Sequence, residues 1–395
     1  MTKVLFVQLG LLADGSSIAL LNLLLRLKSH NIEPIVVLAI DNDYCRKLKD
    51  NNIKYYIVPF RLSVYKKYNS FFKSLFLSTT IFVYTMIINI LAIARIVLIV
   101  LKNRVALIHT NVGPIHIGFF VAKICRIPHV WHLREIQGTR YTSKPIFTLS
   151  YLKRLIWESH AICVSKSVAN HFCAENCISS EVIYDGVFNL NSIPSVSYKQ
   201  KKEQFLFVGR IEPAKGLDEL LDAFVEFKKR NSKYKLICVG RCDDNSYQEH
   251  LINKAVKAGI DNDVIFTGVR EDVAHLMNES LSTIISSRTE GFGFVTAEAM
   301  YNGSLVIGYN VEGTKEQMDN VEMRYTDGVY RYSDISELIS QMEKVVALDS
   351  VEYEKKITTV QKIVEDLYNV DLNCNSIVNY YNKIMKDDFC LSGNS

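Results

Sequence analysis

The sequence predicts an α/β protein with two consecutive domains, each built on a doubly wound parallel sheet. The chain has 395 residues, which is enough for two hydrophobic cores. In both halves, short apolar runs rich in β-branched residues alternate with stretches whose apolar residues recur at helical spacing. A polar stretch near the middle interrupts this alternation, which then restarts. Such alternation is typical of parallel strands with helices on both faces of the sheet.

The first predicted domain covers residues 1–190. Its apolar runs predict strands at residues 4–8, 35–40, 55–58, 106–109, 129–132, 161–164 and 182–184. Helical periodicity and capping residues predict helices at residues 16–27, 43–51 and 115–125, and from residue 166 onward. Polar and glycine residues predict a loop between the strands at 129–132 and 161–164.

An apolar helical region at residues 71–101 also belongs to the first domain. Residues 75–94 carry no charge, and this stretch is long enough to cross a bilayer. However, Thr85 and Asn89 lie within it, and Arg95 interrupts its second half. A membrane crossing would also cut the domain in two. We therefore expect a buried helix or a helix on the membrane surface in preference to a spanning helix.

A second domain is predicted at residues 205–365, after a polar linker at 191–204 that has no periodicity. Its apolar runs predict strands at residues 205–208, 235–239, 264–266, 283–285 and 305–307. The helical patterns cover residues 216–230, 248–258, 273–279, 335–348 and 353–385.

The composition excludes several classes of function. With 48% hydrophobic and 22% charged residues, the chain is typical of globular proteins and not of disordered ones. A net charge of +4 is too small to predict nucleic-acid binding. The nine cysteines are scattered, which favours reduced thiols in a cytosolic protein over a disulfide framework.

Two patterns could hold a metal, but neither is specific. Cys173 and Cys177 lie near histidines, yet no second ligand pair at zinc spacing accompanies them. Asp41 and Asp43 form an Asp-x-Asp pattern after a predicted strand, but this pattern is also typical of turns and helix caps. We therefore expect no bound metal and no cofactor.

The segment from Glu290 to Glu298 carries the most specific chemistry. It follows the predicted strand at 283–285 and leads into a helix. Gly291 and Gly293 allow the backbone to approach a ligand closely, and a helix N-terminus favours an anion. The carboxylates of Glu290 and Glu298 would repel phosphate and bind hydroxyl groups beside it. A ligand with both kinds of group is a nucleotide sugar.

The loop from Gly209 to Gly216 supplies two cations at the carboxyl edge of the same sheet. It lacks the Gly-Lys-Ser/Thr ending of a Walker loop. Ligands of open α/β folds bind at this edge, and Arg210 and Lys215 could neutralise a diphosphate there without a metal. The alternative is an ordinary solvated loop.

His132 ends a predicted strand of the first domain. At this position it could orient an acceptor hydroxyl or help to deprotonate it. His109 ends the preceding strand, and we expect at least one of the two histidines to be only a satisfied polar group. The polar loop that contains Arg134 makes His132 the stronger candidate.

These motifs resemble those of the retaining glycosyltransferases of family 4, whose two Rossmann-like domains face a cleft in the GT-B fold. In the second half, the resemblance rests on Phe207–Arg210 with Lys215–Gly216, Glu290–Gly293 with Glu298–Met300, and Val306–Gly308 with Glu312–Glu316. The first half matches more loosely, through residues 108–111, 163–166 and 182–187.

The resemblance implies a role for each matching residue. Glu298 would hold the ribose of the donor, and Glu290 would contact hydroxyls of the transferred sugar. Arg210 and Lys215 would bind the diphosphate and stabilise charge as the sugar–phosphate bond breaks. His132 would act on the acceptor side. The full donor site would comprise Gly209, Arg210, Lys215, Glu290, Gly291, Phe292, Gly293, Phe294, Val295 and Glu298, and the acceptor side would comprise Gly15, Ser16, His132 and Arg134.

Three departures from the family pattern concern the acceptor side. Leu133 stands where an aspartate often follows the histidine, Asp14-Gly15-Ser16 replaces a glycine pair, and Asp185 replaces a frequent asparagine. The family also implies that a C-terminal helix, residues 366–395, packs back on the first domain.

The resemblance implies a retaining, metal-independent hexosyltransferase that moves a sugar from a UDP- or GDP-sugar to a glycan. Because the apolar helix could dock on a bilayer, we expect a lipid-linked precursor of capsule or O-antigen as acceptor, at the inner face of the cytoplasmic membrane. The alternatives are another nucleotide-sugar enzyme of this fold, such as an epimerase, and a membrane-anchored protein without catalysis. A nicotinamide-dependent oxidoreductase is disfavoured, because no Gly-x-Gly-x-x-Gly follows a predicted strand.

Overall fold

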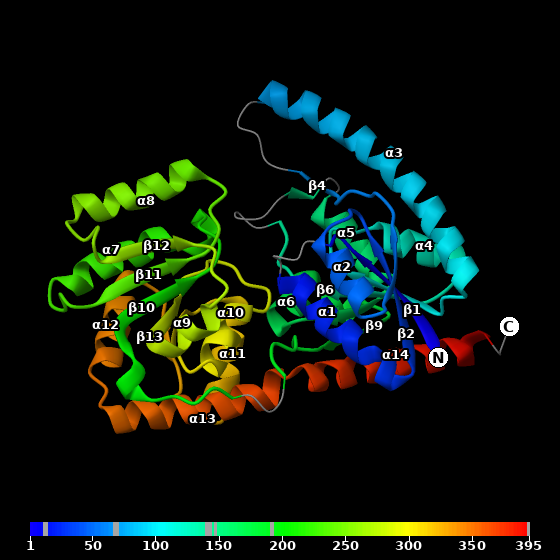
Figure 1. The fold of residues 1–395 in the computed structure, drawn as a ribbon. Helices are drawn as coiled ribbons and strands as arrows, with labels where there is room; N and C mark the ends of the chain where they lie inside the picture. Colours follow the sequence, from blue (N-terminus) through cyan, green and yellow to red (C-terminus); the bar gives the residue numbers. More distant parts are fainter. Residues whose placement is uncertain (11–14, 66–70, 139–143, 146–147, 190–192, 393–395) are drawn as a thin grey trace. The chain divides into compact units, whose positions relative to one another are not determined.

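The structure, a computed structural model of the chain, describes residues 1–10, 15–65, 71–138, 144–145, 148–189 and 193–392. It divides into two compact units (Figure 1). Unit 1 comprises Met1–Gly186 and Val370–Ser395, and unit 2 comprises Val187–Asn369. Each unit is an α/β structure with its own parallel sheet, which confirms the predicted fold class.

Unit 1 contains a seven-stranded parallel sheet in the order β3-β2-β1-β5-β6-β8-β9. Its strands are β1 (Thr2–Gln8), β2 (Ile32–Leu38), β3 (Lys54–Ile57), β5 (Leu107–Asn111), β6 (His129–Leu133), β8 (His160–Cys163) and β9 (Ser179–Val182). The short strands β4 (Val64–Tyr65) and β7 (Lys144–Pro145) form a separate antiparallel pair. The helices are α1 (Gly15–Leu27), α2 (Asp43–Asp50), α3 (Phe71–Asn103), α4 (Ile117–Cys125), α5 (Leu149–Trp157), α6 (Lys166–Phe172) and α14 (Val370–Ser392).

Both faces of the unit 1 sheet are buried. In β1, Val4 and Phe6 join a core that α1 and α14 complete. The intervening residues Leu5 and Val7 join a second core that α3 and α4 complete. Alternate residues of a strand face opposite sides, so a strand covered on both sides must be apolar throughout. This explains the continuous apolar runs in the sequence.

Helix α14 belongs to unit 1, although the residues before it belong to unit 2. Figure 1 shows α14, in red, beside α1. Arg26 of α1 forms an ion pair of 2.5 Å with Asp371 of α14. The sequence predicts helical structure over 353–385, with a C-terminal helix at 366–395; in the structure the two helices α13 and α14 meet at Asn369, whose backbone is extended with φ −76° and ψ 151°.

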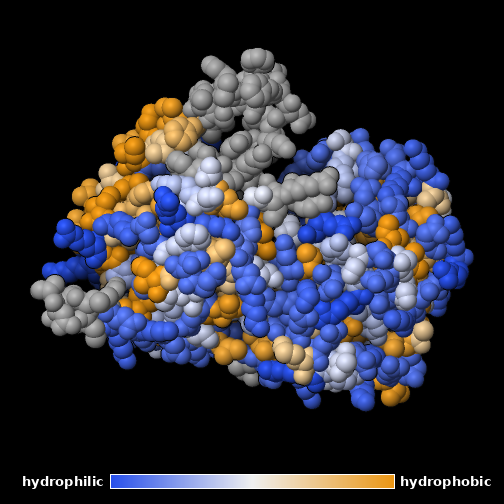
Figure 2. Space-filling view, turned by 180° about the vertical axis from the view of Figure 1, so that it is seen from behind, coloured by the Kyte–Doolittle hydropathy of each residue, from blue (hydrophilic) through white to orange (hydrophobic). Residues whose placement is uncertain are grey.

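Helix α3 places three of its uncharged polar side chains against the rest of unit 1 and many apolar ones in solvent. Thr85, Asn89 and Asn103 are buried, and Asn89 bonds to both backbone polar groups of Arg61. The exposed large hydrophobic residues, here called the α3 apolar face, are Phe82, Val83, Tyr84, Ile87, Ile90, Leu91, Leu98 and Leu101. Figure 2 shows hydrophobic residues gathered where α3 lies, at the upper left. Phe82–Asn103 is the one stretch of the described residues long and apolar enough to cross a membrane, and 28% of its most apolar part is buried.

Unit 2 contains a six-stranded sheet in the order β12-β11-β10-β13-β14-β15, also parallel throughout. Its strands are β10 (Lys202–Val208), β11 (Lys235–Val239), β12 (Val264–Gly268), β13 (Ser280–Ile285), β14 (Leu305–Tyr309) and β15 (Tyr330–Tyr332). The helices are α7 (Leu217–Lys228), α8 (Asn245–Lys257), α9 (Val273–Glu279), α10 (Phe294–Tyr301), α11 (Glu312–Glu322), α12 (Ile335–Val346) and α13 (Ser350–Tyr368).

Two further sequence predictions differ from the structure. Strand β10 already begins at Lys202, inside the predicted linker at 191–204, and the first unit ends at Gly186 instead of residue 190. Helix α5 lies where the sequence predicts a loop. Thr148 caps its N-terminus by accepting a hydrogen bond from Tyr151 N. Its buried residues Leu152, Leu155 and Ile156 have helical spacing, but they span little more than one turn.

Candidate active site

The loop between β13 and α10 carries Glu290 and the two glycines at the carboxyl edge of the unit 2 sheet. Gly293 is the N-cap of α10 and has a φ of +88°, a conformation that few other residues adopt. The helix behind it directs its first N–H groups and its positive dipole end toward this loop. The backbone here is therefore suited to an anion.

Two side chains of α11 hold this loop in place through hydrogen bonds. The Glu312 carboxylate accepts hydrogen bonds of 2.8 Å from both Thr289 Oγ1 and Glu290 N. Gln317 Nε2 donates to the carbonyls of Phe292 and Gly293, at 2.6 and 3.0 Å. The local sequence pattern predicts no role for Glu312 or Gln317. The signal that could have found Glu312 is its place in the Glu312–Glu316 motif, which was used only for the resemblance.

A second set of hydrogen bonds joins the loop to the segment that carries Arg210 and Lys215. Ser286 Oγ donates to Lys215 O at 2.7 Å, and Arg288 N donates to Ala214 O at 2.9 Å. Gly216 has a φ of +68°, and a Cβ there would lie 2.1 Å from Ser286 O. The two glycine loops are thus packed against each other and form one site.

Within this site, Lys215 and Glu290 bind each other. Lys215 Nζ lies 2.5 Å from Glu290 Oε1, and each side chain is 20% exposed. Arg210 is 58% exposed and lies 3.1 Å from Glu212. Lys215, the predicted diphosphate-binding residue, and Glu290, the predicted sugar-binding residue, are therefore adjacent. A bound donor would have to replace the contact between them with contacts of its own.

Glu298 lies in α10, one helical turn into the helix. Burial raises the pKa of its carboxyl above the usual value. Among the described residues, its side chain has no hydrogen bond or ion pair in the structure. A partly buried carboxylate without a partner is suited to accept hydrogen bonds from hydroxyl groups.

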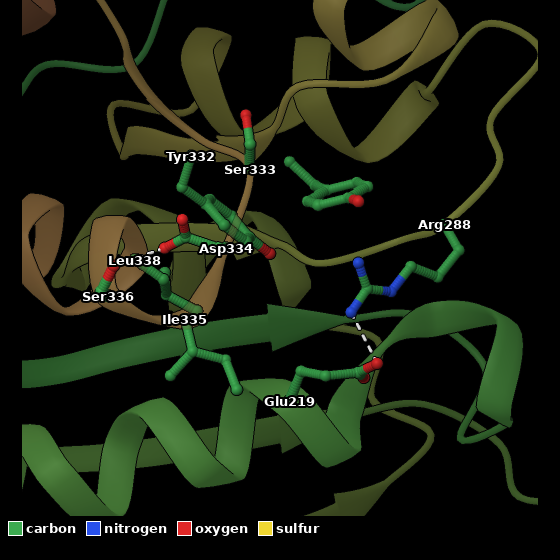
Figure 3. A pocket seen from close by; sticks show the side chains of 9 residues that line it. Glu219, Arg288, Tyr332, Ser333, Asp334, Ile335, Ser336 and Leu338 are labelled. Carbon is green, nitrogen blue, oxygen red and sulfur yellow. Dashed lines mark hydrogen bonds and ion pairs between the residues drawn. The ribbon is translucent and has the colours of Figure 1, made fainter.

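A cavity of about 410 Å³ lies beside these loops (Figure 3). Arg288 points toward Glu219 of α7, with an ion pair of 2.6 Å, and its guanidinium lies 4.5 Å from the Tyr309 ring centroid. Neither Glu290 nor Glu298 lines this cavity. It is therefore distinct from the predicted donor site, although Arg288 belongs to the same loop as Glu290.

In unit 1, the predicted acceptor-side residues lie at the carboxyl edge of that sheet. His132 pairs in register with Asn111 of β5, and His132 and Arg134 are both buried. Gly15 begins α1, and the Ser16 carbonyl accepts a hydrogen bond of 3.2 Å from Asn111 Nδ2. Asp14 lies outside the described residues.

All three guanidinium nitrogens of Arg134 already have hydrogen-bond partners. Its Nη1 contacts both Asp185 carboxylate oxygens at 2.5 Å, and its Nε donates to Asn111 Oδ1 at 2.7 Å. Burial raises the pKa of Asp185, against the opposing effect of Arg134. Asp185, a departure from the family pattern, is the ion-pair partner of Arg134.

Neither candidate metal pattern forms a metal site. Among the described residues, no group of three His, Cys, Asp or Glu side chains could hold a metal ion. Asp43 begins α2 and forms an ion pair with Arg46, while Asn42 caps the helix. Cys173 ends α6.

Known proteins resemble this chain in sequence and in fold. Residues 191–358 match the family described as glycosyl transferases group 1. An uncharacterized glycosyltransferase of Methanocaldococcus jannaschii is 27% identical over 296 residues, covering 68% of this chain and 73% of that protein. The lipopolysaccharide 1,2-N-acetylglucosaminetransferase of Salmonella typhimurium is 27% identical over 198 residues, covering 48% of this chain and 50% of that protein.

A solved structure shows the same fold. The Anabaena protein HepE in complex with UDP and glucose has a TM-score of 0.75 and 20% sequence identity, and the match covers 97% of this chain and 100% of that chain. The family match over residues 191–358, the GT-B fold and the Glu290–Glu298 motif agree in indicating a retaining glycosyltransferase of the group 1 kind that uses a nucleotide-sugar donor.

Proposed function

We propose that this enzyme transfers a hexose from a UDP-sugar to a lipid-linked glycan precursor of a surface polysaccharide, at the inner face of the cytoplasmic membrane. The observation that carries the donor half is the contact between Lys215 and Glu290. It sets a cation and a hydroxyl-binding carboxylate side by side at the N-terminus of α10.

Lys215 and Arg210 would bind the diphosphate and offset the charge that develops on it as the sugar leaves, without a metal. Glu290, released from Lys215, would accept hydrogen bonds from the sugar, and Glu298 would accept them from the ribose. The choice of UDP draws support from HepE, whose structure was solved in complex with UDP and glucose. The glycan acceptor draws support from the Salmonella relative, which acts on lipopolysaccharide.

The α3 apolar face supports the membrane part of the proposal. In a soluble helix the polar residues face water, but here Thr85 and Asn89 face the unit and Ile87 and Leu91 face out. A bilayer surface would cover these apolar side chains. Arg95 and Lys102 are exposed on the same helix and would contact anionic headgroups. A helix that lies on the membrane would bring the enzyme to a lipid-linked acceptor.

The donor half is tested by release of nucleotide from UDP-, GDP- and dTDP-sugars, with membrane extract as acceptor source and with EDTA in one arm. We expect release from a UDP-sugar, unchanged by EDTA. Glu298→Gln should reduce release about 10²-fold, because it removes a charged acceptor at the ribose. Glu226→Gln is the matched control, since Glu226 pairs with Lys229 on the surface of α7 and should leave release unchanged. Near-normal turnover in Glu298→Gln, or no release from any donor, would contradict the proposal.

The membrane half is tested by flotation with vesicles of phosphatidylglycerol and phosphatidylcholine. The full chain should float with the vesicles, and a variant with Ile87, Leu91 and Leu98 changed to Ser should remain at the bottom. Ile252→Ser with Val256→Ser on α8 is the control, because these residues are also exposed and apolar. A wild-type protein that stays with the soluble fraction would show that no bilayer covers α3.

A further inference from the structure

A chain of buried hydrogen bonds links five side chains of unit 1. Asp185 binds Arg134, Arg134 Nη2 lies 3.3 Å from His132 Nδ1, and His132 Nδ1 lies 3.2 Å from His109 Nε2. His109 Nδ1 in turn lies 2.6 Å from the Tyr381 hydroxyl. The chain starts after β9, passes through the end of β6 and the middle of β5, and reaches α14.

The direction of these hydrogen bonds follows from Arg134. A guanidinium has only donors and stays protonated in proteins, so Nη2 must donate and His132 Nδ1 must accept. Burial, Arg134 and His109 hold the pKa of His132 well below its usual value, so its ring is neutral. A neutral imidazole whose Nδ1 accepts carries its single proton on Nε2.

The same logic extends to His109. Because His132 Nδ1 carries no proton, the contact between the two rings requires His109 Nε2 to donate. His109 is also neutral, since burial and Arg134 lower its pKa, so its Nδ1 must accept from the Tyr381 hydroxyl. One assignment thus fits every contact, and it follows from the donor-only guanidinium of Arg134 together with the neutral state of the two buried rings.

The chain ends at an N–H group without a partner. Among the described residues, His132 Nε2 is buried and has no hydrogen-bond partner. Buried donors without partners are rare in proteins and often mark a position that a ligand or a water molecule fills. This atom belongs to a residue at the carboxyl edge of the sheet, where open α/β folds bind their ligands.

We infer that Arg134 and Asp185 are positioning residues that fix the His132 tautomer, so that His132 donates a hydrogen bond from Nε2 to a sugar oxygen and does not take a proton from the acceptor hydroxyl. Asp185 offsets the buried charge of Arg134 and holds its guanidinium in place, while His109 and Tyr381 support the ring from the other side. This inference rests on the proposed function, because it names the contact that His132 makes in that reaction.

The tautomer can be read without substrate. In the full chain labelled with ¹⁵N-histidine, long-range ring spectra show which nitrogen carries the proton, and the His132 signals are those lost in His132→Gln. We expect the proton on Nε2 from pH 6 to pH 8. A proton on Nδ1, or a doubly protonated ring in that range, would overturn the inference.

The positioning role is tested with a double variant, Arg134→Met with Asp185→Leu. Replacing both charged residues leaves no unpaired charge in the site. Proteins often tolerate the replacement of a buried ion pair by apolar side chains of similar size. Without Arg134, the reverse bonding direction through His109 and Tyr381 becomes available, so the His132 signals should show both tautomers. An unchanged spectrum in a folded double variant would show that Arg134 does not set the tautomer. Tyr381→Phe keeps Arg134 and should leave the His132 tautomer unchanged, even if the double variant does not fold.

The catalytic consequence separates a donor from a base. In His132→Gln the amide N–H can still donate, whereas in His132→Ala nothing can. We expect His132→Gln to retain about tenfold more kcat/KM than His132→Ala, the effect of one hydrogen bond. Equal losses in both variants, with an acidic inflection in the wild-type pH profile that the variants lack, would identify His132 as a base. Failure of the wild type to release nucleotide would instead contradict the proposed function and leave the tautomer result standing.

Discussion

The two units place their polar residues at the same edge of similar sheets, yet they build opposite kinds of site. In unit 2 the charged side chains stand on loops, with Arg210 58% exposed and Lys215 20% exposed. In unit 1 the Arg134 and Asp185 side chains are 4% and 2% exposed, and they bond to residues at strand ends. Exposed cations can exchange partners when a charged ligand arrives, whereas a sealed network can only hold its geometry. Unit 2 is therefore suited to capture a charged donor, and unit 1 is suited to orient a neutral ligand.

Breaking the sealed network should have the largest effect on stability. Asp185→Ala leaves the Arg134 charge buried without its partner, which should lower the free energy of unfolding by about 3–5 kcal/mol. Urea unfolding followed by tryptophan fluorescence measures this loss for unit 1 alone, because Trp131 and Trp157 both lie there. The Arg134→Met/Asp185→Leu double variant should lose less than Asp185→Ala. A larger loss in the double variant would mean that packing, and not the unpaired charge, dominates.

Acid should weaken unit 1 more than unit 2. Five described histidines of unit 1 have lowered pKa values, mainly because of burial. His171 is half-buried, and the other four are buried: His116 with a pKa of about 4, His129 of about 3, and His109 and His132 with pKa values well below 6.5. The four buried ones carry the prediction. A histidine with a lowered folded pKa stabilises the fold fully above its unfolded pKa and loses that contribution as the pH falls toward the folded value.

Between pH 7.5 and 5.5, each of these four histidines should therefore cost about 1 kcal/mol of unfolding free energy, or about 4 kcal/mol together. In unit 2, the side chains of His250 and His275 are 58% and 72% exposed. Urea unfolding by tryptophan fluorescence at the two pH values checks the loss. A flat stability of unit 1 over this range would contradict the depressed pKa values.

The open site should be more sensitive in activity than in stability. Lys215→Met removes the cation beside the diphosphate, and we expect kcat/KM to fall about 10²–10³-fold, as for loss of a group that stabilises transition-state charge. Lys229→Met breaks an exposed Lys–Glu pair on α7 and should not change kcat/KM. Steady-state release of nucleotide from the preferred donor measures both. If the two variants lost activity equally, the Lys215 assignment would be wrong.

The backbone support of the open site should matter next. In Gly313→Ala the new Cβ would lie 2.6 Å from the carbonyl oxygens of Gly291 and Phe292, so the donor loop must shift. We expect a loss of about 1–3 kcal/mol in stability and a raised KM for the donor. Gly259→Ala, at a φ of +71° with nothing within 4 Å, should cost about 1–2 kcal/mol without changing KM. Isothermal titration with UDP and urea unfolding separate the two effects.

The smallest effect should come from the surface pair beside the cavity of Figure 3. Arg288→Met removes the contact with Glu219 and the stacking on Tyr309. A partly exposed pair of this kind contributes about 0.5–1 kcal/mol. Thermal unfolding of unit 2 should shift slightly, and kcat/KM should stay within about twofold, since Arg288 N, which bonds to Ala214, is retained. A large loss of activity would mean that this cavity takes part in the reaction.

The sequence predicted most strands because both sheets are covered on both faces. Val4 to Val7 are buried alternately in two cores, and such a run is apolar whatever its neighbours are. Helix α5 and the break at Asn369 escaped prediction. In α5 the buried positions are too few to show a period, and at Asn369 the helical pattern continues on both sides of a backbone change that packing in two separate units imposes.

In the candidate site, too, some features follow from the local sequence and others only from the tertiary structure. Glu290, Gly293 and Glu298 were predicted because their chemistry lies in one short segment, where a strand, a glycine loop and a helix start follow one another. The Lys215–Glu290 contact joins residues 75 positions apart, and Tyr381 reaches His109 across 272 positions. The roles of Asp185, Glu312 and Tyr381 thus came only from the tertiary structure. The local pattern determines what a segment can offer to a ligand, but the partner of each side chain depends on which distant group the fold brings within hydrogen-bonding distance.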